Sequence, residues 1–355
     1  MTQTLELQVA RAVQMAQDQG AIRHAYVAQF DAVSSQSWSF GPGDAPGPGE
    51  ADWFDLASLT KPLCTAPLVL TAVAQGRMGL TFEIGEQFAQ ARMRGGRMLL
   101  WQLLNHSSGL RAYDHDLPPQ ARCATAAARA QFIAERMGGW IQDAPGAGTL
   151  YSDLGYAVLG VLLEAVYGGS LDAIFGRWLH SCAPGLRLGF APVGAPPGQG
   201  RAMPNGAEDD HPWRVHDPLA AHFGGAAGHA GLWSTGPALV SWLQTMLWRA
   251  GDLYTPDLAQ YYLARPAFYT QGTFTLGLDT VSNPSTAGSH PPADAVGHLG
   301  FTGCSFWYSP QRGMGSVLLT DRAAQFPAGV LTEVPPANRA ALFALRQAIH
   351  GACWS

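Results

Sequence analysis

Strand-forming patterns lie near both ends of this chain of 355 residues, and helical patterns fill the long stretch between them. Alternation of apolar and polar residues, typical of half-buried strands, is found in segments 24–30, 34–40, 274–279, 305–309 and 315–321. Helical periodicity predicts a helix that opens at Ser58 and others at 99–104, 124–137, 154–166 and 238–248. The simplest arrangement is one mainly antiparallel sheet, built from both ends of the chain, with a helical lobe inserted between its strands.

Amphipathic helices are also predicted at the two ends, within residues 1–20 and at 338–349, where they can flank the sheet. The expected fold class is therefore α/β (α+β). Residues 1–75 and 225–355 are predicted to form the sheet lobe, and residues 76–224 the mainly helical lobe. A chain of this length suits one catalytic unit made of two such lobes.

Composition excludes several classes of protein. Hydrophobic residues make up 47% of the chain and charged residues 13%, and the net charge is −5. These values argue against a disordered chain and against nucleic-acid binding. The most apolar stretch, 154–167, is shorter than the roughly 20 residues that cross a bilayer, and the N-terminal helix does not resemble an export signal. We therefore expect a cytoplasmic protein without a membrane partner, whose oligomeric state the sequence leaves open.

The cysteines and basic residues give few signals of their own. Five cysteines, widely spaced and without a C-x-x-C pair, indicate neither a disulfide framework nor a zinc site. The arginine-rich segment 92–97 is interpreted as a solvated loop.

Of the 21 Lys and Arg residues, only Lys61 is a lysine. Because a lysine can lose its proton when desolvated and an arginine cannot, this single lysine points to proton transfer.

Ser58 and Lys61 are three residues apart, so a helix that opens at Ser58 places both side chains on one face. The positive end of the helix dipole and burial would both disfavour the charged form of the amine. A partly neutral Lys61 could then accept the proton of the Ser58 hydroxyl and make it a nucleophile. The alternative is that Ser58 caps a helix and Lys61 has no chemical role.

Five segments, in order, resemble the serine β-lactamase and penicillin-binding-protein superfamily, specifically its class C-like branch. They are FDLASLTKPL (54–63), LLWQLLNHSSGL (99–110), PGAGTLYSDLGYAVLG (145–160), GGAAGHAGLWST (224–235) and GHLGFTGCSFWYSP (297–310). The resemblance implies the β-lactamase/transpeptidase-like fold and a serine hydrolase without a cofactor. It also implies Ser58 as the acylated nucleophile, Lys61 as its proton acceptor and Tyr151 as the second acid/base residue. We expect the charge of Lys61 to lower the pKa of the Tyr151 phenol.

Two motifs depart from the family pattern. Asp153 stands where the family usually has asparagine, and we expect it both to contact Lys61 and to cap the helix that begins at residue 154. The family's K-T-G motif is replaced by His298-Leu299-Gly300. This change predicts weak recognition of substrate carboxylates, because a histidine is charged only below about pH 6.5 unless a carboxylate raises its pKa.

The same motif is expected to supply part of an oxyanion hole. By resemblance, its two donors are the backbone N–H groups of Ser58 and Phe301. Gly300 allows a backbone to approach a ligand closely. Thr302 is a candidate to replace the lost threonine hydroxyl.

Other chemistries are less well supported. A metal site could be read from the acidic and histidine side chains of Asp209, Asp210, His211, His216, Asp217 and His222. Their spacing matches no metal motif, so we interpret segment 208–222 as a loop at the border of the cleft and predict no metal. His106 and His229 are interpreted as structural. The G-x-S-x-G elbow of other serine hydrolases and the P-loop are absent from the sequence.

The expected substrate is a small ester, amide or short peptide, and any β-lactamase activity is expected to be weak. One alternative is a D-amino-acid peptidase or D-Ala-D-Ala carboxypeptidase-like enzyme. Another, of a different class, is a catalytically silent binding protein that keeps the fold.

Overall fold

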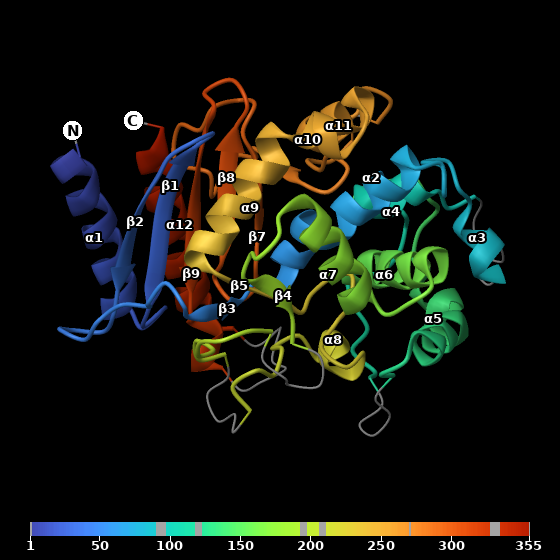
Figure 1. Cartoon of the computed structure of the whole chain (residues 1–355), viewed down its shortest axis with the longest axis horizontal. Coiled ribbons are helices and arrows are strands. Elements are labelled where there is room, and N and C mark those ends of the chain that lie inside the picture. The colour runs from blue at the N-terminus through green and yellow to red at the C-terminus, as the bar shows by residue number, and fades with distance from the viewer. Residues whose placement is uncertain are drawn as a thin grey trace.

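The two ends of the chain meet in a six-stranded antiparallel sheet (Figure 1). The computed structural model describes residues 2–89, 97–117, 123–191, 197–205, 211–269, 271–326 and 334–354. In the order of the sheet, the strands are β2 (Ser35–Phe40), β1 (Ala25–Asp31), β9 (Met314–Thr320), β8 (Ser305–Ser309), β7 (Val296–Leu299) and β6 (Asp279–Thr280). Because β1 pairs with β9, the first and last parts of the chain share one sheet, as the sequence predicts.

Helices cover both faces of this sheet. The terminal helices α1 (Thr2–Asp18) and α12 (Pro336–Cys353) pack together on one face, where their apolar side chains bury Val27 and Leu318. Helix α9 (Gly236–Trp248) packs against β1 on the other face (Figure 1). The sheet is therefore buried between helical layers, which fixes β7 as a rigid wall for the site described below.

The helical lobe is built around α6 (Asp153–Tyr167), which is buried from Leu154 to Glu164. Beside it runs a continuous helical segment that begins as a 3-10 turn at Ala57–Leu59, passes through a π-helical turn at Lys61–Thr65 and ends as α2 (Ala66–Ala74). Surrounding helices are α3 (Ile84–Gln87), α4 (Leu100–Leu104), α5 (Ala126–Trp140), α7 (Leu171–Cys182), α8 (Pro218–His222), α10 (Ala250–Leu253) and α11 (Pro256–Leu263); a further 3-10 turn spans Arg322–Gln325.

A second sheet of three short strands connects the lobes. Its order is β3 (Trp53–Asp55), β5 (Leu232–Thr235) and β4 (Leu188–Phe190), and both pairs are antiparallel. Strands of three or four residues show too little alternation to be predicted from sequence. Strand β3 leads directly into the 3-10 turn that carries Ser58, so this sheet anchors the start of the central helical segment.

Segment 274–279 was predicted as a strand and is one only at its last residue, where β6 begins. Gly277 has φ +135°, and a Cβ there would lie 2.6 Å from the Cβ of Ala66. The chain therefore bends at this glycine to pass over α2, which interrupts the strand pattern.

One helical run among the described residues, Ala57–Ala74, is long and apolar enough to cross a membrane, but 83% of it is buried inside the protein. That burial is expected of a core helix. Helices α6 and α7 pass the same test only together, and they are bent by 72° at the break between them.

A buried ion pair joins α5 to α6. The Arg129 guanidinium binds both carboxylate oxygens of Glu164 and also donates to the backbone carbonyls of Cys123, Ala124 and Phe223. Both charged side chains are at most 4% exposed. Loss of one partner of this buried pair should therefore lower the stability of the fold more than loss of one partner of a surface pair.

We predict that Glu164→Ala lowers the free energy of unfolding by about 3–5 kcal/mol, because it leaves the guanidinium charge buried and unpaired. Urea denaturation measures the change. The matched control is Asp252→Ala, which breaks the exposed pair with Arg249 and should cost less than about 1 kcal/mol. Equal losses in the free energy of unfolding for both variants would contradict the claim that burial makes the Arg129–Glu164 pair important for stability.

Candidate active site

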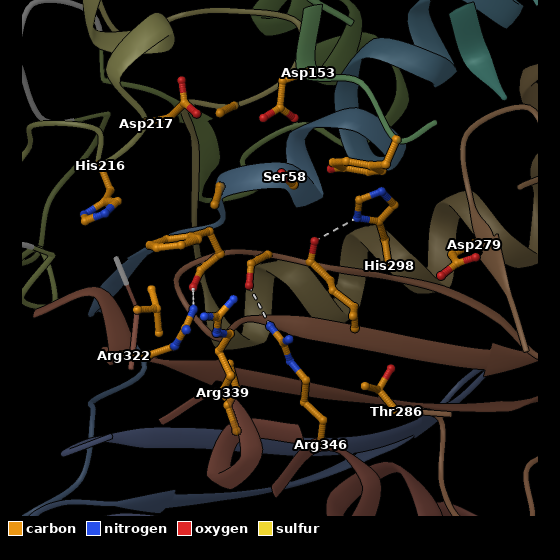
Figure 2. A pocket seen from close by; sticks show the side chains of 18 of the residues that line it. Ser58, Asp153, His216, Asp217, Asp279, Thr286, His298, Arg322, Arg339 and Arg346 are labelled. Carbon is orange, nitrogen blue, oxygen red and sulfur yellow. Dashed lines mark hydrogen bonds between the residues drawn. The ribbon is translucent and has the colours of Figure 1, made fainter. Parts of the chain in front are cut away.

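Ser58 lies at the entrance of the central helical segment, where it lines a cavity of about 590 Å³ (Figure 2). It follows Ala57, whose φ of +47° is unusual for a residue other than glycine. The cavity wall also includes Tyr151, Asp153 and His298, so residues from three separate segments of the sequence meet here. The structure thus brings together most of the side chains that the sequence singled out.

The Lys61 amine is held by three acceptors. Its Nζ lies 3.0 Å from the Ser58 hydroxyl oxygen, 3.0 Å from the backbone carbonyl of His229 and 2.7 Å from a carboxylate oxygen of Asp153. A neutral amine has two N–H donors and one lone pair. If the donors stay on the carbonyl and the carboxylate, the lone pair points at the hydroxyl, which is the geometry needed to accept its proton.

Burial acts on the protonation of this amine. The Lys61 side chain has no exposed surface, and burial lowers the pKa of Lys61 below its usual value of 10.5, although the Asp153 carboxylate opposes the shift. The sequence predicted both effects. The net direction makes the Lys61 amine easier to deprotonate than that of a free lysine, as a base requires.

Tyr151 lies on the loop that enters α6, and it lines the cavity together with Ser58. The Lys61 Nζ is 4.9 Å from the centre of its ring, and the imidazole of His106 packs against it at a tilt of 36°, with the ring centres 4.5 Å apart. The expectation that Lys61 lowers the pKa of Tyr151 is wrong. Burial, followed by the nearby Asp153 carboxylate, raises the pKa of the phenol well above 10. Tyr151 is therefore a neutral phenol that can pass a proton on.

Asp153 has only one of its two expected roles. Its carboxylate pairs with Lys61, but the cap of α6 is Ser152, whose hydroxyl accepts from the N–H of Gly155. Asp153 is the first residue of the helix itself, so its side chain is free to turn toward the amine. The loop is held in place by His106, whose Nδ1 accepts from the N–H of Ser152 at 3.0 Å, a structural role as predicted.

His298, on β7, is not a cation. Its Nδ1 lies 2.9 Å from the carbonyl oxygen of Leu299, which can only accept, so Nδ1 carries the proton. Burial lowers the pKa of His298 to about 3, and the nearby charge of Lys61 acts in the same direction. The third motif therefore presents a neutral imidazole at the cavity wall at any pH near neutrality.

Gly300 and Thr302 connect this motif to the nucleophile. A Cβ on Gly300 would lie 2.7 Å from the carbonyl oxygen of Leu56, so only glycine allows the two backbones to approach. Phe301 lines the cavity and stacks on His216. The suggestion that Thr302 replaces a substrate-binding hydroxyl needs correction, because its buried hydroxyl donates to the backbone carbonyl of Asp55 at 2.7 Å.

Several carboxylates beside the cavity were not identified as site residues from the sequence. Asp55, which lies inside the nucleophile motif, is buried below Ser58. Asp217 lines the cavity and binds His229 Nε2 at 2.8 Å, so it supports the segment whose carbonyl holds Lys61. Asp279 lines the wall near His298, and burial raises its pKa to about 6 (Figure 2). Asp55 lies within the quoted nucleophile motif and Asp217 within segment 208–222, which was expected to border the cleft, whereas Asp279 belongs to no site motif.

The suggested metal cluster falls partly outside the described residues, which omit Glu208, Asp209 and Asp210. Within the residues that are described, no group of three His, Cys, Asp or Glu side chains could hold a metal ion. Asp217 caps α8 by accepting from the N–H of Ala220, and His222 contacts the thiol of Cys123. Segment 92–96 of the predicted arginine-rich loop also lies outside the described part.

The fold and the Ser58–Lys61–Tyr151 arrangement are those of a serine hydrolase with the β-lactamase/transpeptidase fold. Comparison with known proteins agrees, because the family described as Beta-lactamase matches residues 17–333. The chain therefore belongs to the β-lactamase family and is a β-lactamase-related, penicillin-binding-protein-like hydrolase.

Its relatives carry several different names. The N-acetylmuramyl-L-alanine amidase of Bacillus subtilis (strain 168) is 27% identical over 300 residues, covering 76% of this chain and 68% of the relative. A protein of Escherichia coli O157:H7 named "Putative D-alanyl-D-alanine carboxypeptidase" is 27% identical over 301 residues, covering 76% and 69%. The structure of "EstCE1, a hydrolase with promiscuous acyltransferase activity" superposes with a TM-score of 0.69 at 20% identity, covering 98% of this chain and 99% of that one.

We predict that Lys61→Arg abolishes esterase activity, with a loss of at least about a thousandfold, while the protein stays folded. The guanidinium keeps the positive charge but cannot accept the serine proton. Steady-state hydrolysis of p-nitrophenyl acetate, with circular dichroism as the check on folding, measures the effect. A folded, active Lys61→Arg enzyme would rule out the proton-transfer role.

Proposed function

We propose that the protein forms an acyl-enzyme on Ser58 and hydrolyses a small ester, amide or peptide, with Lys61 and Tyr151 as the acid/base pair. The observation that carries this proposal is the buried Lys61 amine, 3.0 Å from the Ser58 hydroxyl oxygen and with a lowered pKa. This arrangement activates a serine without a histidine or a cofactor.

The reaction follows from the contacts. As the Ser58 oxygen bonds to the substrate carbonyl carbon, its proton passes to the neutral Lys61 amine. The carbonyl becomes an oxyanion, which the backbone N–H groups of Ser58 and Phe301 stabilise. Its collapse breaks the bond to the leaving group, which takes a proton from Lys61 through the neutral phenol of Tyr151. Water then attacks the acyl-enzyme with the same groups acting in reverse, which frees Ser58 and the acid.

The charge of the cavity wall favours a substrate without a carboxylate near the reacting carbonyl. His298 is neutral, and Asp153, Asp217 and Asp279 line the cavity. Three arginines, Arg322, Arg339 and Arg346, line the side of the cavity away from Ser58 (Figure 2), and Arg322 and Arg346 donate to the backbone carbonyls of Phe301 and Gly300. Above about pH 6 the Asp279 carboxyl is ionised, so it repels anions more strongly as the pH rises. These features support a small neutral ester, amide or peptide, and they predict slow hydrolysis of β-lactams.

A second candidate is a D-amino-acid peptidase or D-Ala-D-Ala carboxypeptidase-like enzyme. The name of the Escherichia coli relative favours it. The neutral His298 argues against the carboxypeptidase form, because a carboxypeptidase must bind the terminal carboxylate of its substrate.

We predict that a fluorophosphonate adds one adduct to the protein and none to Ser58→Ala, because only the activated serine attacks phosphorus. Intact-protein mass spectrometry measures the adduct. A panel of p-nitrophenyl esters, nitrocefin and D-Ala dipeptides then ranks the substrates, and faster turnover of nitrocefin than of short esters would contradict the proposed preference. An unmodified wild-type protein at every pH would leave the catalytically silent alternative in place.

We further predict that His298→Lys raises the ratio of kcat/KM for penicillin-like anions to kcat/KM for neutral esters by about tenfold. The substitution restores a cation at the third motif, and one favourable charge interaction is typically worth about 1 kcal/mol or more. His298→Gln, which adds no charge, is the control. An unchanged ratio in the folded lysine variant would show that this position does not set charge preference.

A further inference from the structure

Asp55 is a buried carboxylate to which the proposed mechanism assigns no role. It ends β3, three residues before Ser58, and is 4% exposed. Three N–H donors converge on it, from the backbone of Ala57 (2.8 Å), the backbone of His216 (2.9 Å) and the side chain of Asn205 (2.7 Å). Burial nevertheless raises the pKa of Asp55. Burial of a carboxylate destabilises the folded protein unless it is compensated. The presence of one three residues before the nucleophile therefore calls for an explanation.

One contact of Asp55 acts on the turn that presents Ser58. The N–H of Ala57 donates to Oδ1 of Asp55, and Ala57 has a φ of +47°. Such a conformation is strained for alanine and persists only when its surroundings enforce it. The carboxylate supplies that restraint and thereby sets the direction of the next peptide group, whose N–H belongs to Ser58.

The backbone of Asp55 acts on the opposite side of the cleft. Its carbonyl accepts from the hydroxyl of Thr302 at 2.7 Å, which ties the turn carrying Phe301 to the nucleophile segment. The same two segments touch where Gly300 lies against Leu56. One residue therefore contacts both segments from which the expected oxyanion donors come.

Arg346, on α12, lines the same cavity and binds the turn after β7. Its Nη2 donates to the carbonyls of Gly300 (2.6 Å) and Cys304 (3.1 Å), as the dashed line to Arg346 in Figure 2 shows for one of them. The carbonyl of Gly300 and the N–H of Phe301 belong to one peptide group. A cation on the carbonyl fixes the plane of that group and strengthens its N–H as a donor.

We propose that Asp55 and Arg346 are positioning residues that fix the two backbone N–H donors of the oxyanion hole, those of Ser58 and Phe301. This inference rests on the proposed acyl-enzyme function. Asp55 is not part of the cavity wall, whereas Arg346 lines it and uses its Nη2 on the carbonyls of Gly300 and Cys304. Each acts through a peptide group, so its loss should weaken transition-state binding and leave ground-state binding almost unchanged.

The first test is Asp55→Asn. The amide can still accept from Ala57, but its NH₂ group then faces the N–H donors of His216 and Asn205, so the turn must shift. Misplaced oxyanion donors cost about 10- to 100-fold in rate. We expect kcat for p-nitrophenyl acetate and affinity for phenylboronic acid, which forms a tetrahedral serine adduct, to fall by such a factor at nearly constant KM. The control is Asp52→Asn, at the residue before β3, which weakens a pairing with Arg201 and a hydrogen bond from the N–H of Gly49.

A gentler pair of variants keeps the test valid if Asp55→Asn does not fold. Thr302→Val removes the hydroxyl without changing the side-chain volume, and Thr302→Ser retains it. We expect the valine variant to lose kcat and boronate affinity together, and the serine variant to recover most of both. Arg346→Gln should behave like the valine variant, whereas the control Arg312→Lys, in the turn between β8 and β9 and outside the cavity wall, should not.

The outcomes separate the two proposals. If wild-type protein shows no acylation by a fluorophosphonate, the proposed function fails. If wild-type protein is acylated, and the folded Asp55, Thr302 and Arg346 variants keep wild-type kcat and boronate affinity, only the positioning roles fail. A rise in KM at constant kcat would likewise contradict positioning, because it indicates lost ground-state binding.

Discussion

The site depends on one buried amine held by two acceptors beside a hydroxyl. The His229 carbonyl and the Asp153 carboxylate bind the Lys61 Nζ and leave its third position facing Ser58. These groups come from three separate parts of the chain, so the amine is placed correctly only when both lobes are assembled. The central helical segment passes between the lobes and carries both Ser58 and Lys61, and this explains why it is so thoroughly buried.

In the proposed mechanism, the sheet and the helical lobe divide the chemistry. The lobe supplies the acid/base groups, because α6 and the loop before it hold Asp153 and Tyr151 against Lys61. The sheet supplies the side of the cavity that faces the oxyanion as it forms on the substrate carbonyl, because β7 and the turn after it carry His298 and Phe301. The nucleophile lies where β3 leads into the helix, in contact with both. Substitution of a neutral imidazole for the family's lysine changes the charge of the wall and leaves this division intact.

Much of the fold could be predicted from the sequence because its main signals are local. The hairpin at the start, the last two strands and the terminal helices follow from periodicity, and an antiparallel sheet that unites the chain ends is the simplest way to bury them. The short strands of the second sheet give no such signal. The bend at Gly277 depends on a contact with Ala66, more than 200 residues earlier, which no local pattern contains.

The candidate site shows the same limit. Motif spacing indicated Ser58 and Lys61, and the family resemblance indicated Tyr151. The direction of the Tyr151 pKa shift depends on how far the phenol is buried, which the sequence does not show. The cap of α6 was assigned to Asp153 although Ser152 precedes it, because both residue types cap helices and only the structure shows which side chain turns back. Thr302 was assigned to the substrate because its partner, the carbonyl of Asp55, is distant in sequence.

The central claim is that Lys61 is the base, and its uniqueness allows a direct measurement. Protein labelled with ¹³C at Cε of lysine should give a single lysine signal, whose titration reports the pKa of Lys61 alone. The same sample gives the pH dependence of inactivation by a fluorophosphonate. The account predicts a Lys61 pKa below 10.5 and an inactivation rate that rises with pH through that same value. A pKa at or above 10.5, or an inactivation profile that does not follow the lysine titration, would contradict it.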